Sequence, residues 1–328
     1  MFASRLWYKF WQFLFYHNGK VTALVYNKEC LSHSVPPGNP ETPERLTTIL
    51  EAIEQSNIRS HLLYTSSAPA TDAQIARVHP PSYLNYLESL IPIEGNQQID
   101  QDTVINGNSL NAARYAAGAV IKAVDMVMKH KVANAFCLTR PPGHHAQTKR
   151  TQGFCFFNNV AIGVMHVLAQ YRLKRIAIVD FDAHHADGTE EIFKDDNRVM
   201  LLSSFQHPFF PFGGDDATGS NPNIILSPLK AGSGSNVIRH IVNKVWLPKL
   251  KAFRPEMIFI CAGFDGHKND QMSHLNFTEE DFYWITEQLI NISYHYAKGR
   301  VVSLLEGGYE LDALGKSAVA HIRALTES

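Results

Sequence analysis

The sequence lacks a strong charge of either sign, because 30 Lys and Arg residues stand against 31 Asp and Glu residues, for a formal net charge of -1. Without a basic excess, we expect no direct binding to nucleic acid. Cysteine is also scarce, since only four occur and none of them stand in a C-x-x-C spacing. We therefore predict reduced, mostly buried thiols of the kind found in cytosolic proteins.

Long hydrophobic runs are absent too, since no stretch approaches the roughly 18 consecutive apolar residues of a transmembrane helix. Residues 1–20 do place large apolar side chains on one face of a helix, but polar residues interrupt them too often for a signal-peptide core. We interpret residues 1–20 as an N-terminal aromatic amphipathic helix that is part of the domain or appended to it. Membrane contact through residues 1–16 is the alternative, and the expected location is cytoplasmic.

No internal repeat or low-complexity tract divides the remaining chain, so residues 21–328 are expected to form one domain. Five short apolar runs have the length and composition of buried strands: 135–139, 175–179, 199–202, 257–261 and 301–305. Helix patterns flank them at 42–56, 109–130, 157–171, 236–252 and 278–297. Continuous apolar strands that alternate with helices indicate an α/β fold with a mainly parallel sheet and helices on both faces.

Polar and glycine-rich segments follow each of these apolar runs. In chain order they read RPPGHHA, DFDAHHADG, SSFQHPFFP, AGFDGH and EGGY. The carboxyl ends of parallel strands meet at one edge of the sheet, where open α/β sheets bind their ligands. The order of strands and segments therefore predicts an active site at this edge.

The segment DFDAHHADG contains candidate metal ligands. In an extended chain alternate side chains point the same way, so Asp180, Asp182 and His184 lie on one side. Asp182 and His184 are placed to hold one cation, and Asp265, after another strand, provides a third ligand. Two carboxylates and one imidazole suit Zn²⁺ with a fourth position left for water or substrate, although Fe²⁺ and Mn²⁺ fit the same donors. Each fragment alone is often structural, for example a helix cap, but their combination at strand ends favours a metal site.

Acid and base groups lie close to this metal segment. His144 and His145 stand in a PGHH turn, and Asp180 and Asp187 are not needed as metal ligands. A carboxylate bonded to Nδ1 fixes the tautomer of an imidazole and raises its basicity. Two His–Asp dyads beside one metal are suited to general acid and base catalysis on a hydrolytic water.

Aromatic residues complete the predicted site. Tyr309 follows two glycines at a strand end, where its phenol is placed to donate to an oxyanion opposite the metal. Phe154, Phe209 and Phe210 are predicted to line a narrow channel for an aliphatic chain. For Phe209 a plain core position explains the sequence equally well.

In order along the chain, RPPGHHA, GFCFFNNVA, DFDAHHADGTEEIF, AGFDGH and LEGGY resemble the signature motifs of the histone deacetylase family. The similarity spans residues 25–325, and SSFQHPFFPF is similar to bacterial and class II-like members, relatives of acetylpolyamine amidohydrolases and acetoin-utilisation proteins. The resemblance implies the arginase-like, deacetylase-like α/β fold for a catalytic domain over 21–328. It also implies zinc-dependent hydrolysis of acyl-lysine amides in a peptide or protein substrate.

The resemblance further implies a role for each matching residue. One Zn²⁺ per chain would be held by Asp182, His184 and Asp265. The catalytic set would be His145 as general base and then acid, with Asp187 behind it, His144 backed by Asp180, and Tyr309 polarising the acyl carbonyl. The substrate would contact the Gly153 carbonyl and the aromatic walls Phe154 and Phe210. Structural K⁺ would be bound by Ser203, Ser204 and backbone oxygens of Asp180, Asp182 and His184, with a second cation near Phe193, Asp196 and Val199.

Some positions depart from the family pattern. Phe205 stands where many relatives have His, which affects the K⁺ site, and Asn39 stands where His is common in the substrate-binding loop. Polyamine-preferring relatives carry an acidic gatekeeper after the last metal ligand, whereas Met272 stands at that place here. We therefore favour acyl-lysine substrates, unless the loop turns Asp270 inward.

Other functions remain open on sequence alone. A small-molecule amidohydrolase acting on acetylpolyamines is one, and a catalytically silent acyl-lysine-binding protein is another. The intact His144, His145 and Tyr309 argue against a silent protein. A two-metal enzyme of arginase type needs a carboxylate two residues after Asp265, where His267 stands instead. The sequence leaves the oligomeric state open.

Overall fold

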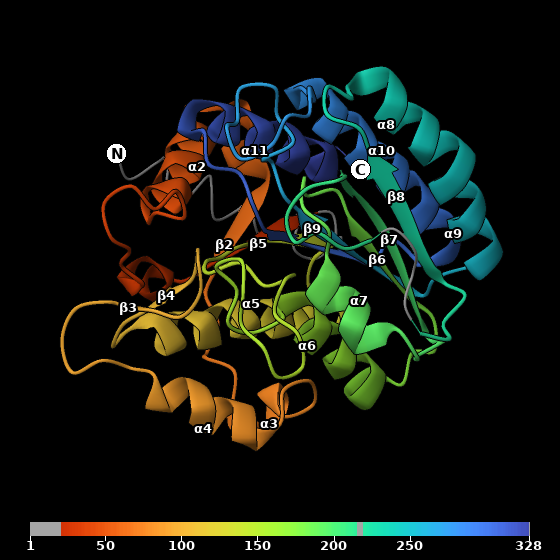
Figure 1. Cartoon of the computed structure of the whole chain (residues 1–328). Helices are drawn as coiled ribbons and strands as arrows, with labels where there is room; N and C mark the ends of the chain where they lie inside the picture. Colours follow the sequence, from red (N-terminus) through yellow and green to blue (C-terminus); the bar gives the residue numbers. More distant parts are fainter. Residues whose placement is uncertain (1–20, 215–218, 328) are drawn as a thin grey trace, which may run out of the picture.

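The computed structural model describes residues 21–214 and 219–327, so the helix expected over residues 1–20 lies outside the described residues. Its centre is an eight-stranded sheet in the order β2-β1-β5-β10-β9-β6-β7-β8, and every neighbouring pair is parallel (Figure 1). The strands are β1 (Thr22–Tyr26), β2 (Leu62–Thr65), β5 (Asn134–Leu138), β6 (Ile176–Asp180), β7 (Val199–Gln206), β8 (Ile224–Leu229), β9 (Met257–Ala262) and β10 (Val301–Leu305). Two short strands, β3 (Gln97–Gln98) and β4 (Val104–Ile105), form a separate antiparallel pair.

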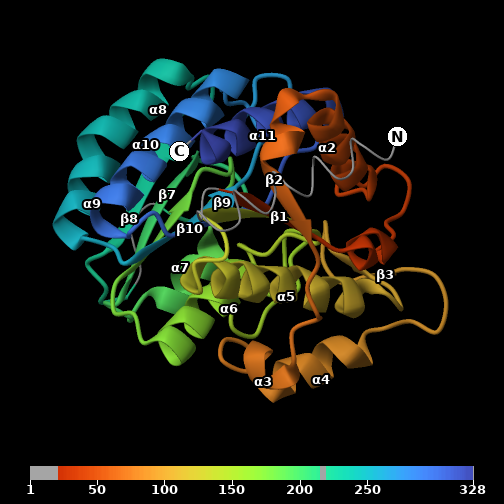
Figure 2. The ribbon, with the colours of Figure 1, turned by 180° about the vertical axis from the view of Figure 1, so that it is seen from behind.

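Helices cover both faces of the sheet. One layer contains α3 (Asp72–Ile75), α4 (Pro81–Ser89), α5 (Ser109–Met128), α6 (Asn159–His166) and α7 (Asp187–Phe193) (Figure 1). The opposite layer contains α2 (Glu44–Gln55), α8 (Ser235–Ile241), α9 (Leu247–Phe253), α10 (Glu279–Tyr296) and α11 (Leu311–Thr326), as the view from behind also shows (Figure 2). Short π-helical turns over Val167–Tyr171 and Val242–Trp246 extend α6 and join α8 to α9. The predicted α/β fold, with a parallel sheet between two helical layers, is confirmed.

The core consists of two apolar layers separated by the sheet. Alternate residues of β6 enter opposite layers, so that Ile176 and Ile178 pack with α5 and α6 while Ala177 and Val179 pack with α10 and α11. Both faces of the central strands are therefore buried. This arrangement explains why these strands read as continuous apolar runs and not as alternating ones.

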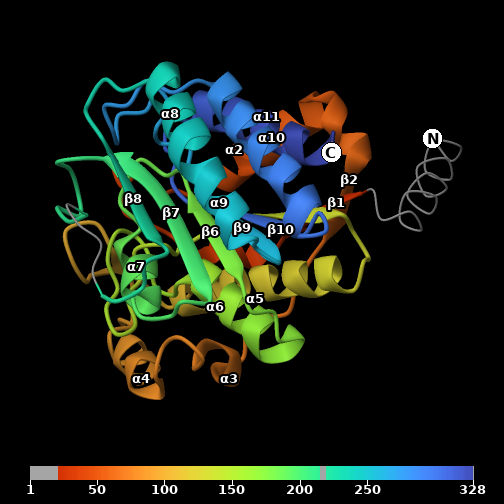
Figure 3. The ribbon, with the colours of Figure 1, turned by 90° about the vertical axis from the view of Figure 1, so that its right-hand side faces the viewer.

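Three strands of the eight-stranded sheet, and the short pair β3 and β4, were not predicted from the sequence. Strands β2 and β8 form the two edges of the sheet and are partly exposed, and β1 lies next to β2. Figure 3 shows β8 at its edge beside β7. Edge strands bury less apolar surface, so their sequences are less strongly apolar than those of central strands. Strand β7 also continues beyond the predicted run, through the polar residues Ser203, Ser204 and Gln206.

The expectations for the cysteines and for a helix beginning near residue 278 are confirmed. All four cysteines are buried and free. Helix α10 begins after Thr278, which forms a capping box with Asp281 in an acidic first turn. In the part of the chain that the structure describes, no helix combines the length and apolarity needed to cross a membrane.

A buried histidine on helix α11, His321, leads to a prediction of how the free energy of unfolding depends on pH. His321 is fully buried, and its Nδ1 and Nε2 lie 2.6 and 2.7 Å from the hydroxyl oxygens of Thr286 and Ser303. Burial lowers the pKa of His321 to about 3. The unfolded chain therefore binds a proton below pH 6.5 that the folded chain excludes, so stability is lost as pH falls from about 6.5 toward 3.

We expect His321→Asn to remove up to about 1.4 kcal/mol per pH unit from the slope of the unfolding free energy between pH 4.5 and 6. Urea unfolding at several pH values measures this slope. The matched control is His130→Asn at an exposed position, which should leave the slope unchanged. Equal slopes in the wild type and His321→Asn would contradict the prediction.

Candidate metal centre and channel

The polar segments that follow the central strands converge at one edge of the sheet. Strands β5, β10, β9 and β6 are consecutive neighbours in the sheet, although they are far apart in sequence. All of them are parallel, so their carboxyl ends bring the GHH, EGGY, GFDGH and DFDAHH segments together. The structure therefore places the predicted site residues in a single region.

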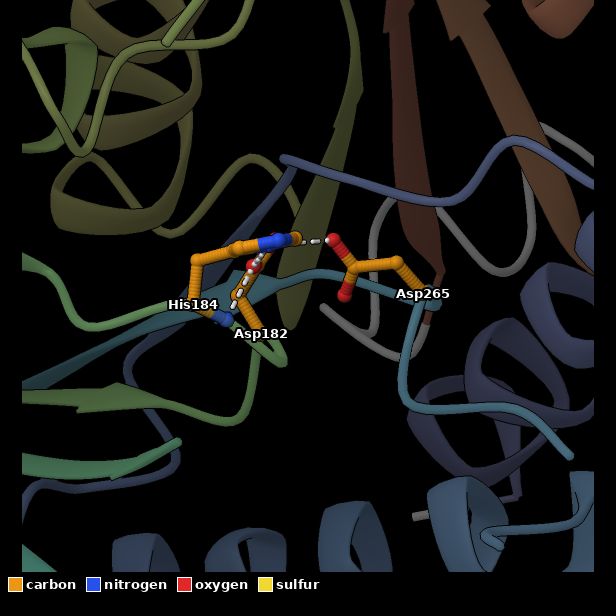
Figure 4. Close-up of side chains that lie close together, drawn as sticks. All are labelled: Asp182, His184 and Asp265. Atoms are coloured by element: carbon orange, nitrogen blue, oxygen red, sulfur yellow. Dashed lines mark hydrogen bonds and ion pairs between the residues drawn. The ribbon is translucent and has the colours of Figure 1, made fainter. Parts of the chain in front are cut away.

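Asp182, His184 and Asp265 form the centre of this region (Figure 4). The Nδ1 atom of His184 lies 3.1 Å from Asp182 Oδ1 and 3.0 Å from Asp265 Oδ2. All three residues are buried, and their donor atoms lie within 4.8 Å of one another. Among the described residues this is the only cluster of His, Cys, Asp and Glu with such spacing.

The local chemistry of this trio fits a divalent cation. Burial, together with the negative charge of Asp182, raises the pKa of Asp265 to about 7. Burial disfavours a charged His184, but the two carboxylates outweigh it and raise its pKa to about 10. Buried carboxylates so close together require a compensating positive charge, which a metal ion provides. Backbone N–H groups hold both carboxylates. Asp182 accepts from Gly307 at Oδ2 and from His184 at Oδ1, and Asp265 accepts from Ala183 at Oδ1.

Glycines make room for these carboxylates. A Cβ atom on Gly263 would lie 2.0 Å from Asp182 Oδ2, and one on Gly307 would lie 2.2 Å from Asp265 Oδ2. Any larger residue would therefore displace a candidate ligand. This close approach explains why the AGFDGH and EGGY segments carry glycine at these two places.

Both expected His–Asp pairs are present. His144 Nδ1 lies 3.1 Å from Asp180 Oδ2, and His145 Nδ1 lies 2.8 Å from Asp187 Oδ1. Burial disfavours a charged His144, but Asp182 and Asp180 outweigh it and raise its pKa well above 6.5. Burial and the neighbouring charge of His144 lower the pKa of His145 to about 4. The two imidazoles therefore differ in their favoured protonation state. His144 is favoured as a cation, and His145 is favoured as a neutral base.

Glu306 positions the histidine turn, and sequence reasoning missed it. Its Oε2 atom accepts hydrogen bonds from the backbone N–H groups of Gly143 and His144, at 2.7 and 3.2 Å. Glu306 is fully buried at the end of β10, immediately before the Gly-Gly-Tyr sequence. The only signal in the sequence was an acidic residue directly after an apolar strand.

A cavity of about 280 Å³ leads to the candidate metal centre. Its lining includes the expected His145, Gly153, Phe154, His184, Phe210 and Tyr309. Phe209, which the sequence left ambiguous, also lines it and stacks on the ring of His184, with centroids 5.6 Å apart. The walls are therefore largely aromatic, as a channel for an aliphatic chain requires.

The guanidinium group of Arg45 packs on the ring of Tyr309. The sequence did not indicate this contact. The Arg45 guanidinium carbon lies 4.8 Å from the centroid of the phenol ring, and its Nε donates to the Gly308 carbonyl at 2.6 Å. Burial raises the pKa of Tyr309 well above 10. The phenol therefore keeps its proton and remains a hydrogen-bond donor.

The rim of the channel carries one carboxylate that sequence reasoning overlooked. Asp102 lines the cavity together with Gln101, Gln271 and Met272, and these four residues are exposed or partly exposed, as expected at the channel mouth. No motif distinguished Asp102 from other acidic loop residues. Asp270 does not turn its carboxylate to this rim, because backbone groups occupy both of its oxygens. Oδ2 accepts hydrogen bonds from the backbone N–H groups of Tyr309 and Glu310, and Oδ1 accepts one from the backbone N–H of Met272.

The candidate K⁺ residues lie beside the metal segment. Ser203 on β7 is paired with Asp180 on β6. The hydroxyls of Ser203 and Ser204 are buried and have no hydrogen-bond partner among the described residues. Unpartnered buried oxygens fit a cation site. Phe205, in place of the more common His, packs its ring on His185 with centroids 4.6 Å apart.

The second cation expected near Phe193, Asp196 and Val199 stays a prediction. The backbone carbonyls of these three residues accept hydrogen bonds from the side-chain Nδ2 of Asn221, at 3.0, 2.9 and 2.9 Å. His267, which stands where a two-metal enzyme needs a carboxylate, has its Nε2 atom 3.4 Å from a carboxylate oxygen of Glu279.

Comparison with known proteins gives a consistent result. The family described as "Histone deacetylase domain" matches residues 39–325. Type-2 histone deacetylase 2 of Dictyostelium discoideum is 33% identical over 93% of this chain, which spans 21% of that relative. Polyamine deacetylase HDAC10 of Mus musculus is 33% identical over 93% of this chain, which spans 48% of that relative.

A solved structure has the same fold. The structure titled "Crystal Structure of HDA15 HD domain" superposes with a TM-score of 0.87 at 29% sequence identity, over 94% of this chain and 90% of that one. The family match covers most of the chain and includes all the site segments described above. The chain therefore belongs to the histone deacetylase family.

Proposed function

We propose that this protein is a zinc-dependent hydrolase of acyl-lysine amides in peptides or proteins. The observation that supports this most directly is the buried Asp182–His184–Asp265 trio at the end of an aromatic channel. When bound there, zinc supplies a Lewis acid that polarises the acyl carbonyl and activates water. A cation at Ser203 and Ser204 belongs to the same proposal as a structural K⁺ site.

The chain's own residues would perform the remaining steps. His145, neutral and held through Nδ1 by Asp187, takes a proton from the attacking water at Nε2 and returns it to the leaving amine. His144, held by Asp180, stabilises the negative charge that develops. Tyr309 keeps its phenol proton and donates a hydrogen bond to the acyl oxygen.

Substrate binding follows from the channel. The aromatic rings of Phe154 and Phe210 enclose the aliphatic part of the lysine side chain, and the Gly153 carbonyl accepts the amide N–H. Turnover of an acetyl-lysine peptide by the zinc-loaded protein tests the proposal. Absence of turnover on acetyl-lysine and longer acyl-lysine peptides, with zinc bound, would refute it.

Asp102 favours a second candidate, the hydrolysis of acetylpolyamines. A polyamine carries a further cationic amine, and Asp102 is a carboxylate at the channel mouth. The mouse relative named a polyamine deacetylase adds support. An ion pair at such a partly exposed rim contributes at most about 1 kcal/mol, roughly fivefold in affinity. We therefore retain acyl-lysine as the first candidate.

We expect a higher kcat/KM for an acetyl-lysine peptide than for N-acetylspermidine, because the rim offers a single weak anion to the second amine. A competition assay at equal concentrations measures the ratio in the wild type, in Asp102→Asn and in the exposed control Glu94→Gln. Preferential consumption of acetylspermidine, lost in Asp102→Asn and kept in Glu94→Gln, would establish the polyamine candidate instead.

A further inference from the structure

A second cavity adjoins the catalytic dyad. This outer cavity has a volume of about 560 Å³ and is lined by Gln147, Arg150, Gln152 and Asp187, among others. It shares Gln101, Phe210 and Phe212 with the substrate channel. His145 lines the channel, whereas its partner Asp187 lines the outer cavity, where its side chain is 15% exposed. The dyad therefore spans the wall between two cavities.

Asp187 receives three N–H donors and meets no acceptor. Its Oδ1 accepts from His145 Nδ1 at 2.8 Å, and its Oδ2 accepts from Gln147 Nε2 at 3.1 Å and also from Gln152 Nε2. Amide nitrogens only donate, so a proton on Asp187 would have no partner among them. The arrangement favours the ionised carboxylate. Burial raises the pKa of Asp187, but the bonds from His145 and Gln147 outweigh it and lower that pKa.

The two glutamines also connect the dyad to the substrate channel. Gln147 follows the His-His-Ala sequence, and Gln152 directly precedes Gly153, whose carbonyl we assign to the substrate amide. Gln152 is buried, with 5% of its surface exposed. A Cβ atom on Gly153 would lie 2.5 Å from His145 Cδ2, so this part of the wall touches the base directly. The hydrogen bond from Gln152 to Asp187 therefore holds the Gly153 part of the channel wall in place relative to His145.

We propose that Gln147 and Gln152 are positioning residues that hold Asp187 as an ionised acceptor and thereby keep the His145 proton on Nδ1. Nε2 of His145 is then left free to act as the base toward the channel. The inference rests on the proposed function, because it gives these glutamines a part in the reaction assigned to His145. Partners that orient a functional histidine from behind typically change activity about 10- to 100-fold when they are removed.

The test replaces each glutamine with methionine, which has a similar length and no N–H donor. We expect Gln147→Met and Gln152→Met each to lower kcat about tenfold, and the double variant about a hundredfold, with KM nearly unchanged. Arg150→Met is the matched control, because Arg150 lines the same cavity, is exposed, and forms no side-chain bond to Asp187. Unchanged kcat in both single variants, or an equal loss in Arg150→Met, would overturn the proposal.

A second readout does not depend on turnover. The hydrogen-bonded Nδ1–H proton of His145 is expected as a low-field NMR resonance in the zinc-loaded protein without substrate, assigned by its loss in His145→Ala. Gln152→Met should shift or broaden this resonance, since the acceptor is less fixed. If the wild type hydrolyses no acyl amide, the proposed function fails, while a resonance altered by Gln152→Met still supports the positioning role. A resonance identical in Gln152→Met and the wild type refutes that role whether or not the protein is active.

Discussion

Asp265→Asn is expected to weaken zinc binding by about 10²–10³-fold and to reduce turnover by at least as much at limiting zinc. The substitution keeps the size of the side chain, and the amide oxygen still accepts the Ala183 N–H bond that Asp265 Oδ1 accepts now. It removes one negative charge from a fully buried trio in which Asp265 Oδ2 lies 3.0 Å from His184. Removing one partner from a buried ionic group costs about 3–5 kcal/mol, and about 1.4 kcal/mol corresponds to a factor of ten.

Competition with a chromophoric chelator gives the zinc affinity, and metal analysis gives the stoichiometry. The control is Asp312→Asn on α11, where the carboxylate is 69% exposed and pairs only with Lys316 at the surface. Thermal unfolding of the apoproteins separates a metal effect from a folding defect. Wild-type zinc affinity in Asp265→Asn would contradict the assignment of this trio. Two zinc equivalents per chain would instead indicate a second metal site.

The parts of the site that the sequence predicted have a common physical origin. Asp182, His184 and Asp265 immediately follow buried strands whose apolar runs are easy to recognise, so their place in the sheet follows from local sequence. The same holds for His144 and His145 after β5. Parallel pairing then brings the carboxyl ends of these strands together without any further information.

The supporting residues were not predictable, because their partners are distant in sequence. Glu306 bonds a turn 163 positions away, and Arg45 bonds Gly308 at a separation of 263 positions. The packing of the helical layers on the sheet decides these pairings. It determines which backbone group each buried carboxylate or guanidinium contacts. Asp102 is a similar case, since only the folded chain shows that its loop reaches the channel mouth. Sequence reasoning therefore identified the candidate site residues that lie close together and missed much of what positions them.

Tyr309→Phe is expected to lower kcat by about 10²–10³ while leaving zinc binding, KM and thermal stability nearly unchanged. Removal of one hydrogen-bond donor to a developing oxyanion lowers kcat by about 10²–10³. The substitution removes only the hydroxyl group. The ring would keep its contacts with Phe154, at a centroid distance of 5.7 Å, and with the Arg45 guanidinium at 4.8 Å. The backbone N–H of Tyr309 would still donate to Asp270.

The matched control is Tyr294→Phe, at a tyrosine that is 52% exposed on α10, where loss of the hydroxyl should leave kcat unchanged. The assay is steady-state hydrolysis of an acetyl-lysine peptide by zinc-saturated protein, with zinc content measured on the same samples. A fall in kcat at constant zinc content separates the role of the phenol from that of the metal ligands, because loss of a ligand changes both. Near wild-type kcat in Tyr309→Phe would mean that the phenol only packs against Phe154 and Arg45, and the oxyanion would then have to be stabilised by zinc and the charged His144 alone.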